Sequence, residues 1–225
     1  MSKLTIALIC PSRGRPQNIA RLHQALLDTD FHGIFVVGVD DDDTGYLEDQ
    51  SPRYENTVYE VNPRLRLAGT LNKLALEYAD KADIIGFVGD DHLPQGTWEA
   101  DILAAFERQP TGFVYGNDQY QRQALPTAVF VSSNIVKAIG YMCPPGFVHM
   151  YLDNVWLSLG SEAGCIQYLE DTNIEHLHPA AGKAEWDPRY EEVNSTETVH
   201  GDAALYHTWR ETAFLDAVAK IKELL

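Results

Sequence analysis

Two carboxylates and an imidazole, from Asp90, Asp91 and His92, follow the apolar segment 84–88 after a single residue, Gly89. An Ile- and Val-rich segment of this kind predicts a strand that is buried on both faces. Acidic residues at the carboxyl end of such a strand lie where open α/β sheets bind ligands, although aspartate is also a common turn residue. Adjacent carboxylates repel each other unless a cation, such as a divalent metal carrying a phosphorylated ligand, offsets their charge. The segment therefore indicates a metal-assisted enzyme, and we favour Asp91 as the ligand because it can turn toward the cleft.

Asp40 has the same position after a second apolar segment, 34–39. A carboxylate there can accept hydrogen bonds from a ribose hydroxyl or from the imide N–H of a base. Asp41, Asp42 and Asp43 come next, and we interpret these three residues as a solvated acidic turn.

Arg13 and Arg15 lie in the loop that follows the first predicted strand and begins at Pro11. They could be plain surface residues. In a chain whose formal net charge is −16, however, two guanidiniums beside a ligand cleft favour contact with a phosphate or stacking on a base. Arg64 and Arg66 form a second basic pair that could line the same cleft.

Two imidazoles, from His176 and His178, are spaced by two residues and are followed by Pro179. On an extended segment both side chains point to one face, so both could reach a metal. A lone histidine is more often a hydrogen-bonded residue than a ligand. We favour His178 as the ligand, and we expect His176 to orient the His178 ring without binding the metal itself.

Asp153 follows three hydrophobic side chains near the start of a predicted helix. It could stabilise the helix N-terminus, or it could act as a general base whose pKa is tuned by apolar neighbours. Farther along, Lys183 and Trp186 could belong to a lid over a diphosphate or could be surface residues.

The elements that must position these side chains alternate regularly in the first half of the chain. Such alternation predicts right-handed βαβ units and a mainly parallel sheet, with a mixed second half. We see no internal repeat or linker, so we expect a single domain over 1–225. We expect strands at 4–10, 34–39, 57–61, 84–88, 112–115, 128–131 and 165–169, helices at 17–27, 67–79, 98–108, 132–139, 151–159 and 202–225, and a polar mobile loop over 179–198.

The composition of the chain restricts the classes of function that it could have. The 33 acidic residues against 17 basic ones disfavour broad binding to nucleic acid or anionic membranes. A local basic cleft, for example one containing Arg64, Arg66 and Arg122, would still be compatible with DNA. No apolar run approaches the length of about 18 residues that a membrane span needs, and the start of the chain lacks the layout of a signal peptide. Three widely spaced cysteines argue against a disulfide framework and favour a cytoplasmic setting.

The order of these motifs resembles that of nucleotide-sugar-dependent glycosyltransferases of the GT-A type, close to family 2. Residues 6–16 are similar to the family's opening strand and its P-[ST]-R-x-R-P loop, and residues 37–41 to its second strand with a base-binding aspartate. Residues 67–75 resemble its Gly- and Asn-containing helix. Residues 87–91 align with its DxD metal motif, except that Gly89 stands where the family has its first Asp. The match covers residues 4 to 95, and the small size is similar to that of bacteriophage-encoded enzymes.

The resemblance implies an α/β GT-A fold in which 1–95 is the nucleotide- and metal-binding half and 96–225 the acceptor half. It implies transfer of a sugar from a nucleoside diphosphate, UDP being favoured, to an acceptor hydroxyl with inversion. The acceptor is left open between a glycan, a protein and a modified DNA base. The implied assignments are Asp153 as catalytic base, Asp91 and His178 as ligands of Mn2+ or Mg2+, and Pro11, Arg13, Arg15, Asp40, Arg66 and Asp90 as nucleotide-binding residues.

Three other functions remain open. A dinucleotide-dependent oxidoreductase would share the alternating elements, but the loop after the first strand lacks G-x-G-x-x-G. A metal-dependent hydrolase could activate water with Asp90, Asp91, His176 and His178. A catalytically silent nucleotide-binding module would keep Asp40 and the fold, and Gly89 is the feature that favours it.

Overall fold

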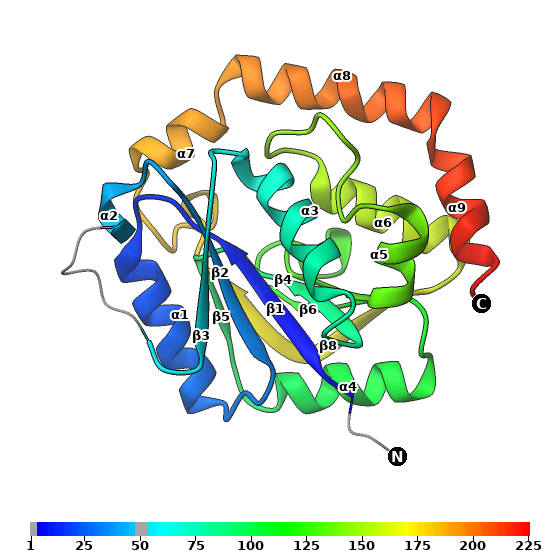
Figure 1. Cartoon of the computed structure of the whole chain (residues 1–225), viewed down its shortest axis with the longest axis horizontal. Helices are drawn as coiled ribbons and strands as arrows, with labels where there is room; N and C mark the ends of the chain where they lie inside the picture. The colour runs from blue at the N-terminus through cyan, green and yellow to red at the C-terminus, as the bar shows by residue number, and fades with distance from the viewer. Residues whose placement is uncertain (1–3, 48–53) are drawn as a thin grey trace.

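A mixed eight-stranded sheet forms the centre of the part of the chain that the structure describes, residues 4–47 and 54–225 of a computed structural model (Figure 1). Neighbouring strands follow the order β3-β2-β1-β4-β7-β6-β8-β5. The first four are mutually parallel, β7 is antiparallel to its neighbours β4 and β6, and β5 is antiparallel to β8. The strands are β1 (Ile6–Pro11), β2 (Ile34–Asp40), β3 (Thr57–Asn62), β4 (Ile84–Phe87), β5 (His92–Pro94), β6 (Phe113–Asn117), β7 (Val129–Ser132) and β8 (Ile166–His176).

Helices cover both faces of this sheet. One face packs against α1 (Pro16–Asp28) and α4 (Trp98–Arg108). The other packs against α3 (Arg66–Tyr78), α5 (Ser133–Ile139), α6 (Leu152–Ala163) and α9 (Phe214–Lys222). The remaining elements are α2 (Thr44–Leu47), α7 (Pro188–Val193), α8 (Thr196–Thr212) and the 3-10 turns η1 (Arg122–Ala124) and η2 (Pro179–Ala181). Within the described ranges, no helix combines the length and the apolarity that a bilayer span requires.

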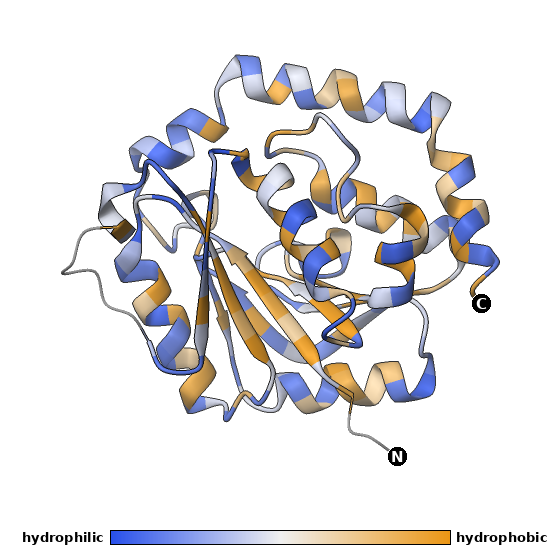
Figure 2. Ribbon diagram, viewed as in Figure 1, coloured by the Kyte–Doolittle hydropathy of each residue, from blue (hydrophilic) through white to orange (hydrophobic). Residues whose placement is uncertain are grey.

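The central strands are apolar on both sides because both sides are covered (Figure 2). In β1, Leu8 and Cys10 contribute to the core under α1 and α4, whereas Ala7 and Ile9 contribute to the core under α3. All four side chains are fully buried. The sheet therefore holds the carboxyl ends of β1, β2 and β4 firmly side by side.

The structure corrects the prediction for the second half in three places. Strand β8 continues to His176, well beyond the predicted end at 169, because a bulge at Gly116 and Asn117 keeps β6 paired with it. The predicted loop 179–198 contains η2, α7 and the start of α8, since Asp187 and Ser195 cap the two helices.

The third correction concerns the predicted C-terminal helix 202–225. It is two helices that meet at Ala213. The change of direction lets α9 bury Phe214, Val218 and Ile221 in the core that α5 and α6 also cover. A short strand, β5, was also not predicted, and it pairs His92 with His176.

Candidate active site

A cavity of about 450 Å³ opens at the carboxyl ends of β1, β2 and β4. Its wall includes every residue for which the sequence predicted a role in nucleotide binding, metal binding or catalysis: Pro11, Arg13, Arg15, Asp40, Arg66, Asp90, Asp91, Asp153 and His178. Lys183 and Trp186 are not among the lining residues. Lys183 forms an ion pair with Glu175 at 2.8 Å, and Trp186 is exposed.

The two carboxylates after β4 point into different surroundings. Asp90 accepts hydrogen bonds from the Ser12 hydroxyl at 2.6 Å and from the Asn18 amide at 3.1 Å. Asp91 accepts one from the Tyr190 hydroxyl at 2.7 Å. Burial and the neighbouring charge of Asp91 raise the pKa of Asp90. Burial would also raise the pKa of Asp91, but His176 and His92 lower it well below its usual range, so Asp91 is the carboxylate that stays ionised.

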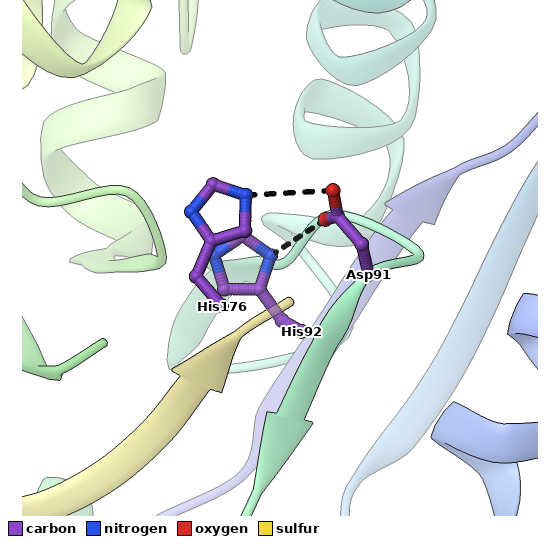
Figure 3. Close-up of side chains that lie close together, drawn as sticks. All are labelled: Asp91, His92 and His176. Atoms are coloured by element: carbon purple, nitrogen blue, oxygen red, sulfur yellow. Dashed lines mark ion pairs between the residues drawn. The ribbon is translucent and has the colours of Figure 1, made fainter. Parts of the chain in front are cut away.

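Asp91, His92 and His176 form a cluster whose donor atoms lie within 4.8 Å of one another (Figure 3). Nδ1 of His92 is 3.2 Å from one carboxylate oxygen of Asp91, and Nε2 of His176 is 3.4 Å from the other. The antiparallel pairing of β5 with β8 places the two histidines opposite each other, and their rings stack at 4.1 Å between centroids. One carboxylate and two imidazoles converging in a cavity fit a transition metal such as Mn2+.

His176, rather than the predicted ligand His178, is the imidazole next to Asp91. His178 lines the same cavity with its ring centroid 5.1 Å from that of His176, and its Nδ1 accepts a hydrogen bond from the backbone N–H of Ala180. Burial lowers the pKa of both His176 and His178. Both rings are therefore neutral near pH 7, which is the form that can bind a metal.

Gly89 is explained by this cluster. A Cβ atom at this position would lie 2.6 Å from Oδ1 of Asp91 and 2.9 Å from Nδ1 of His92. The backbone N–H of Gly89 also donates to that Nδ1 at 3.1 Å. The departure from the DxD pattern is thus what allows His92 to approach Asp91.

The acidic run after β2 is not uniformly solvated, contrary to the prediction. Asp41 and Asp42 are exposed, but Asp43 is buried and accepts hydrogen bonds from the backbone N–H groups of Gly14 at 2.6 Å and Gly45 at 3.0 Å. Asp43 therefore connects the β1–α1 loop to α2, because it supplies the acceptor that a backbone N–H of each segment requires.

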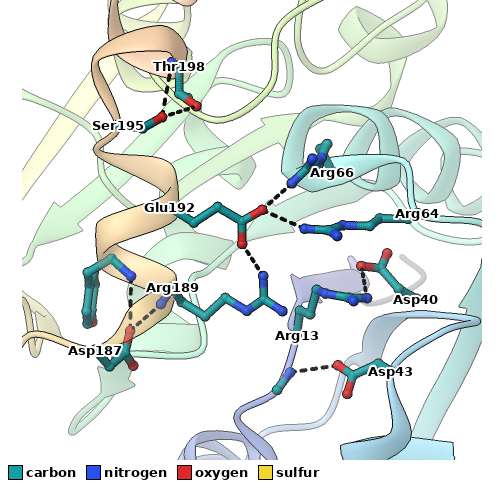
Figure 4. A network of polar contacts seen from close by, with 12 residues as sticks. Arg13, Asp40, Asp43, Arg64, Arg66, Asp187, Arg189, Glu192, Ser195 and Thr198 are labelled. Carbon is teal, nitrogen blue, oxygen red and sulfur yellow. Dashed lines mark hydrogen bonds and ion pairs between the residues drawn. The ribbon is translucent and has the colours of Figure 1, made fainter.

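Arginines gather along the cavity, each beside a carboxylate (Figure 4). Arg13 pairs with Asp40 at 2.9 Å and also with Asp42. Its buried Nε has no hydrogen-bond partner within the described ranges. Arg64 and Arg66 both pair with Glu192 of α7. In so acidic a chain, this concentration of guanidiniums favours an anionic ligand.

Helix α7 supplies three groups that the sequence analysis missed. Asp187 pairs with Arg15 at 2.6 Å, Tyr190 donates to Asp91, and Glu192 holds Arg64 and Arg66. The guanidinium of Arg15 lies 4.2 Å from the centre of the Tyr190 ring. The sequence does contain a local signal for the start of this helix: Asp187 is a typical N-cap residue, and Pro188 follows it at the first helical position.

Asp153 lies in the first turn of α6 and borders the cavity. One carboxylate oxygen accepts the N–H of Asn154 at 2.9 Å. Burial raises its pKa, which suits a group that must take up a proton. The preceding loop adds His149 to the lining, and this loop is held by Asp202, which accepts three consecutive backbone N–H groups from residues 148–150.

No protein-family model matches the sequence, and a search of curated proteins found no match. Solved structures do match. Residues 1–349 of S. aureus TarS in complex with UDP share 16% identity, with a TM-score of 0.61 over 93% of this chain and 73% of that one. The mannosyltransferase PcManGT from Pyrobaculum calidifontis, in complex with GDP-Man and Mn2+, shares 12% identity, with a TM-score of 0.61 over 98% and 74%.

This chain has a GT-A glycosyltransferase fold. GalNAc-T7 with UDP, GalNAc and Mn2+ gives a TM-score of 0.63 at 10% identity, over 78% of this chain and 44% of that one. The predicted fold class, an α/β sheet flanked by helices with a mixed second half, is confirmed.

Proposed function

We propose that this GT-A protein is a metal-dependent glycosyltransferase that moves a sugar from a nucleoside diphosphate to an acceptor hydroxyl. One observation supports the proposal most strongly. A single cavity contains both the ionised Asp91 with its two neighbouring imidazoles and the guanidiniums of Arg13 and Arg15. A metal centre next to fixed cations suits a diphosphate, whose negative charge both can offset.

The nucleotide half of the cavity is built from β1 and β2. Asp40 would accept hydrogen bonds from the base or ribose, Pro11 would bound the pocket, and the unpaired Nε of Arg13 would donate to the ligand. Arg15, Arg66 and Asp90 complete this wall. TarS is seen with UDP and with UDP-GlcNAc, and PcManGT with GDP-Man. We favour a UDP-type donor.

The metal would be held by Asp91 and His176, with His92 and the predicted ligand His178 completing the set. Imidazole nitrogens among the ligands favour Mn2+ over Mg2+, and both PcManGT and GalNAc-T7 are seen with Mn2+. A cation held by these residues would supply positive charge beside the diphosphate and so favour its departure as a leaving group.

Asp153 would take the proton from the acceptor hydroxyl as that oxygen attacks the anomeric carbon. The raised pKa of Asp153 brings it closer to the range in which a base works near neutral pH. Direct attack by the acceptor gives inversion of the anomeric centre. Glycan, protein and modified DNA base all remain candidate acceptors, because each presents a hydroxyl.

The test is a thermal-shift screen of nucleoside diphosphates, each with and without Mn2+, followed by a donor-sugar screen. A ligand at a hundred times its Kd stabilises the fold by about 2.7 kcal/mol, which raises the melting temperature by several degrees. We expect a shift with a diphosphate that grows when Mn2+ is present, and its loss in Asp91→Asn. No shift with any nucleotide would contradict the proposal and favour the hydrolase.

A further inference from the structure

Asp118, just after β6, is buried and lies outside the cavity lining. Its two carboxylate oxygens have different partners. Oδ1 accepts hydrogen bonds from the backbone N–H groups of Tyr120 at 2.9 Å and Arg122 at 2.6 Å. Oδ2 accepts a hydrogen bond from the hydroxyl of Thr127 at 2.8 Å. A buried carboxylate that accepts this many hydrogen bonds is a fixed part of the structure and not a solvated turn residue.

Oδ2 of Asp118 lies near both imidazoles of the candidate metal cluster: the Thr127 hydroxyl links it to His92, and His176 is close to it directly. Nε2 of His92 lies 3.4 Å from the Thr127 hydroxyl oxygen. Nδ1 of His176 is buried without a hydrogen-bond partner among the described residues, and Oδ2 of Asp118 is 3.9 Å away from it. The backbone reinforces the contact, since the N–H of His176 donates to the Asp118 carbonyl at 2.9 Å.

The directions of these contacts fix which nitrogen of His92 carries the proton. Thr127 gives its hydroxyl proton to Asp118, so its oxygen is free to accept the Nε2–H of His92. Nδ1 of His92, which faces Asp91, then carries the lone pair and accepts the N–H of Gly89. His176 is held differently, because its Nε2 lies 3.4 Å from the ionised Asp91 carboxylate, to which an Nε2–H donates. If Nε2 bound a metal instead, the ring proton would move to Nδ1, which lies 3.9 Å from Oδ2 of Asp118.

We propose that Asp118 is the positioning residue of the metal site: through Thr127 it sets the tautomer of His92, and its Oδ2 would accept the Nδ1–H that His176 carries once its Nε2 binds a metal. The inference rests on the proposed function, because it assumes that this cluster binds a metal. Metal-binding histidines commonly donate their second N–H to a carboxylate, which fixes the ring and strengthens the ligand.

Oδ1 extends this role to the third imidazole. The turn after Asp118 contains two non-glycine residues with left-handed backbone, Gln119 at φ 58° and Arg122 at φ 51°, a conformation that costs energy unless contacts hold it. Oδ1 supplies those contacts. The turn carries Tyr120, whose ring stacks on His178 at 5.6 Å with an interplanar angle of 8°. One buried carboxylate thus supports His92, His176 and His178.

Asp118→Asn separates this role from a structural one. The amide oxygen of asparagine can keep the two backbone hydrogen bonds of the turn. Its NH2 group, however, cannot accept a hydrogen bond from Thr127 or from an Nδ1–H of His176. The Thr127 hydroxyl would then be free to donate to Nε2 of His92, which moves the proton of that ring onto Nδ1, and His176 would lose the acceptor for its metal-binding tautomer.

The experiment is titration calorimetry of the full chain with Mn2+ alone, paired with 15N NMR of the histidine side chains in metal-free protein. We expect Asp118→Asn to fold and to weaken Mn2+ binding by about tenfold to a hundredfold, with His92 converted to the Nδ1–H tautomer. Thr127→Val, which removes the hydroxyl at nearly constant shape, should weaken Mn2+ binding less and disturb His92 alone.

Asp101→Asn is the matched control, because Asp101 also accepts threonine hydroxyls, those of Thr97 and Thr172, but does not line the cavity. It should bind Mn2+ like the parent chain. If Asp118→Asn keeps both the Mn2+ affinity and the His92 tautomer of the parent, the inference is wrong while the metal site stands. If the parent chain binds no Mn2+, the metal dependence in the proposed function fails first.

Discussion

The two walls of the cavity are built in different ways. The first wall consists of loops that directly follow β1, β2 and β4, and its side chains are fixed close to the sheet, as Ser12 is to Asp90. The second wall comes from β8, α6 and α7, and long-range side-chain contacts join it to the first: Tyr190 to Asp91 and Asp187 to Arg15. The first wall carries the guanidiniums of Arg13 and Arg15, whereas the second carries neutral imidazoles, Asp153 and carboxylates of α7 and its N-cap that pair with arginines. We therefore expect the first to govern donor binding and the second to govern turnover.

Asp91 is the residue where the two walls meet, so its removal should have the largest effect. Asp91→Asn keeps the shape but removes the charge that two imidazoles and Tyr190 surround. We expect sugar transfer to fall about a thousandfold and Mn2+ binding to be lost. The measurements are transfer kinetics and titration calorimetry. Asp101→Asn again serves as the control, and transfer at the parent rate by Asp91→Asn would show that this cluster is not the metal site.

Asp153→Asn tests the second wall alone. Loss of a general base should lower kcat by a factor of about 10² to 10³ and leave the affinity for nucleotide and Mn2+ unchanged. The checks are steady-state kinetics and thermal shift with UDP and Mn2+. Glu162→Gln, an exposed carboxylate on the same helix, should behave like the parent. An unchanged kcat, or a loss confined to donor affinity, would show that Asp153 is not the base.

The same contrast explains what the sequence could predict. Asp40 and Asp91 each follow an apolar run, and a parallel sheet brings the ends of such runs to one edge. Arg13 and Arg15 follow β1 in the same way. These positions depend on local patterns, so the first wall was predicted nearly complete, within a residue or two at the strand ends.

The second wall depends on contacts that no local pattern encodes. Tyr190 meets Asp91 across 99 residues, and Asp118 has the appearance of an ordinary turn residue until β8 is seen to pass beside it. The sequence favoured His178 over His176 as the ligand because Pro179 and a polar segment follow His178. Once the bulge carries β8 to His176, pairing with β5 sets that ring beside His92.

The second wall should also be the first part of the site to lose folding stability as the pH falls. Burial lowers the pKa of His149 from 6.5 to about 4, so the unfolded chain takes up a proton that the folded chain does not. Stability should therefore fall as the pH drops from about 6.5 to 4, by at most about 3 kcal/mol for this residue. Asp91 loses its contribution at still lower pH, because its folded pKa lies well below 3.8.

Urea unfolding at several pH values between 4 and 7 measures this effect. His149→Gln should flatten the dependence of the unfolding free energy on pH in that window. Some slope should remain, because the lowered pKa values of His176 and His178 act in the same direction. A variant with the full parental slope would show that His149 is protonated as easily in the folded chain as in the unfolded one.

Gly89 gives the smallest and sharpest test of how the walls fit together. Restoring the family's carboxylate with Gly89→Asp supplies a further potential metal ligand, and on the DxD pattern alone it would strengthen Mn2+ binding. The geometry predicts the opposite, since any Cβ there would lie 2.6 Å from Asp91 and 2.9 Å from His92. We expect both Gly89→Ala and Gly89→Asp to lose about 1–3 kcal/mol of stability through overpacking.

Calorimetry with Mn2+ separates the two outcomes, and Gly96→Ala is a suitable comparison because a Cβ at Gly96 meets nothing within 4 Å. Its backbone is left-handed at φ 63°, so it should lose stability through strain while leaving Mn2+ binding unchanged. If Gly89→Asp instead binds Mn2+ more tightly than Gly89→Ala and the parent, the added carboxylate has displaced His92 as a ligand. His92 would then be dispensable for metal binding, and β5 would serve to close the sheet, because a ligand that one carboxylate can replace does not require the pairing of His92 with His176.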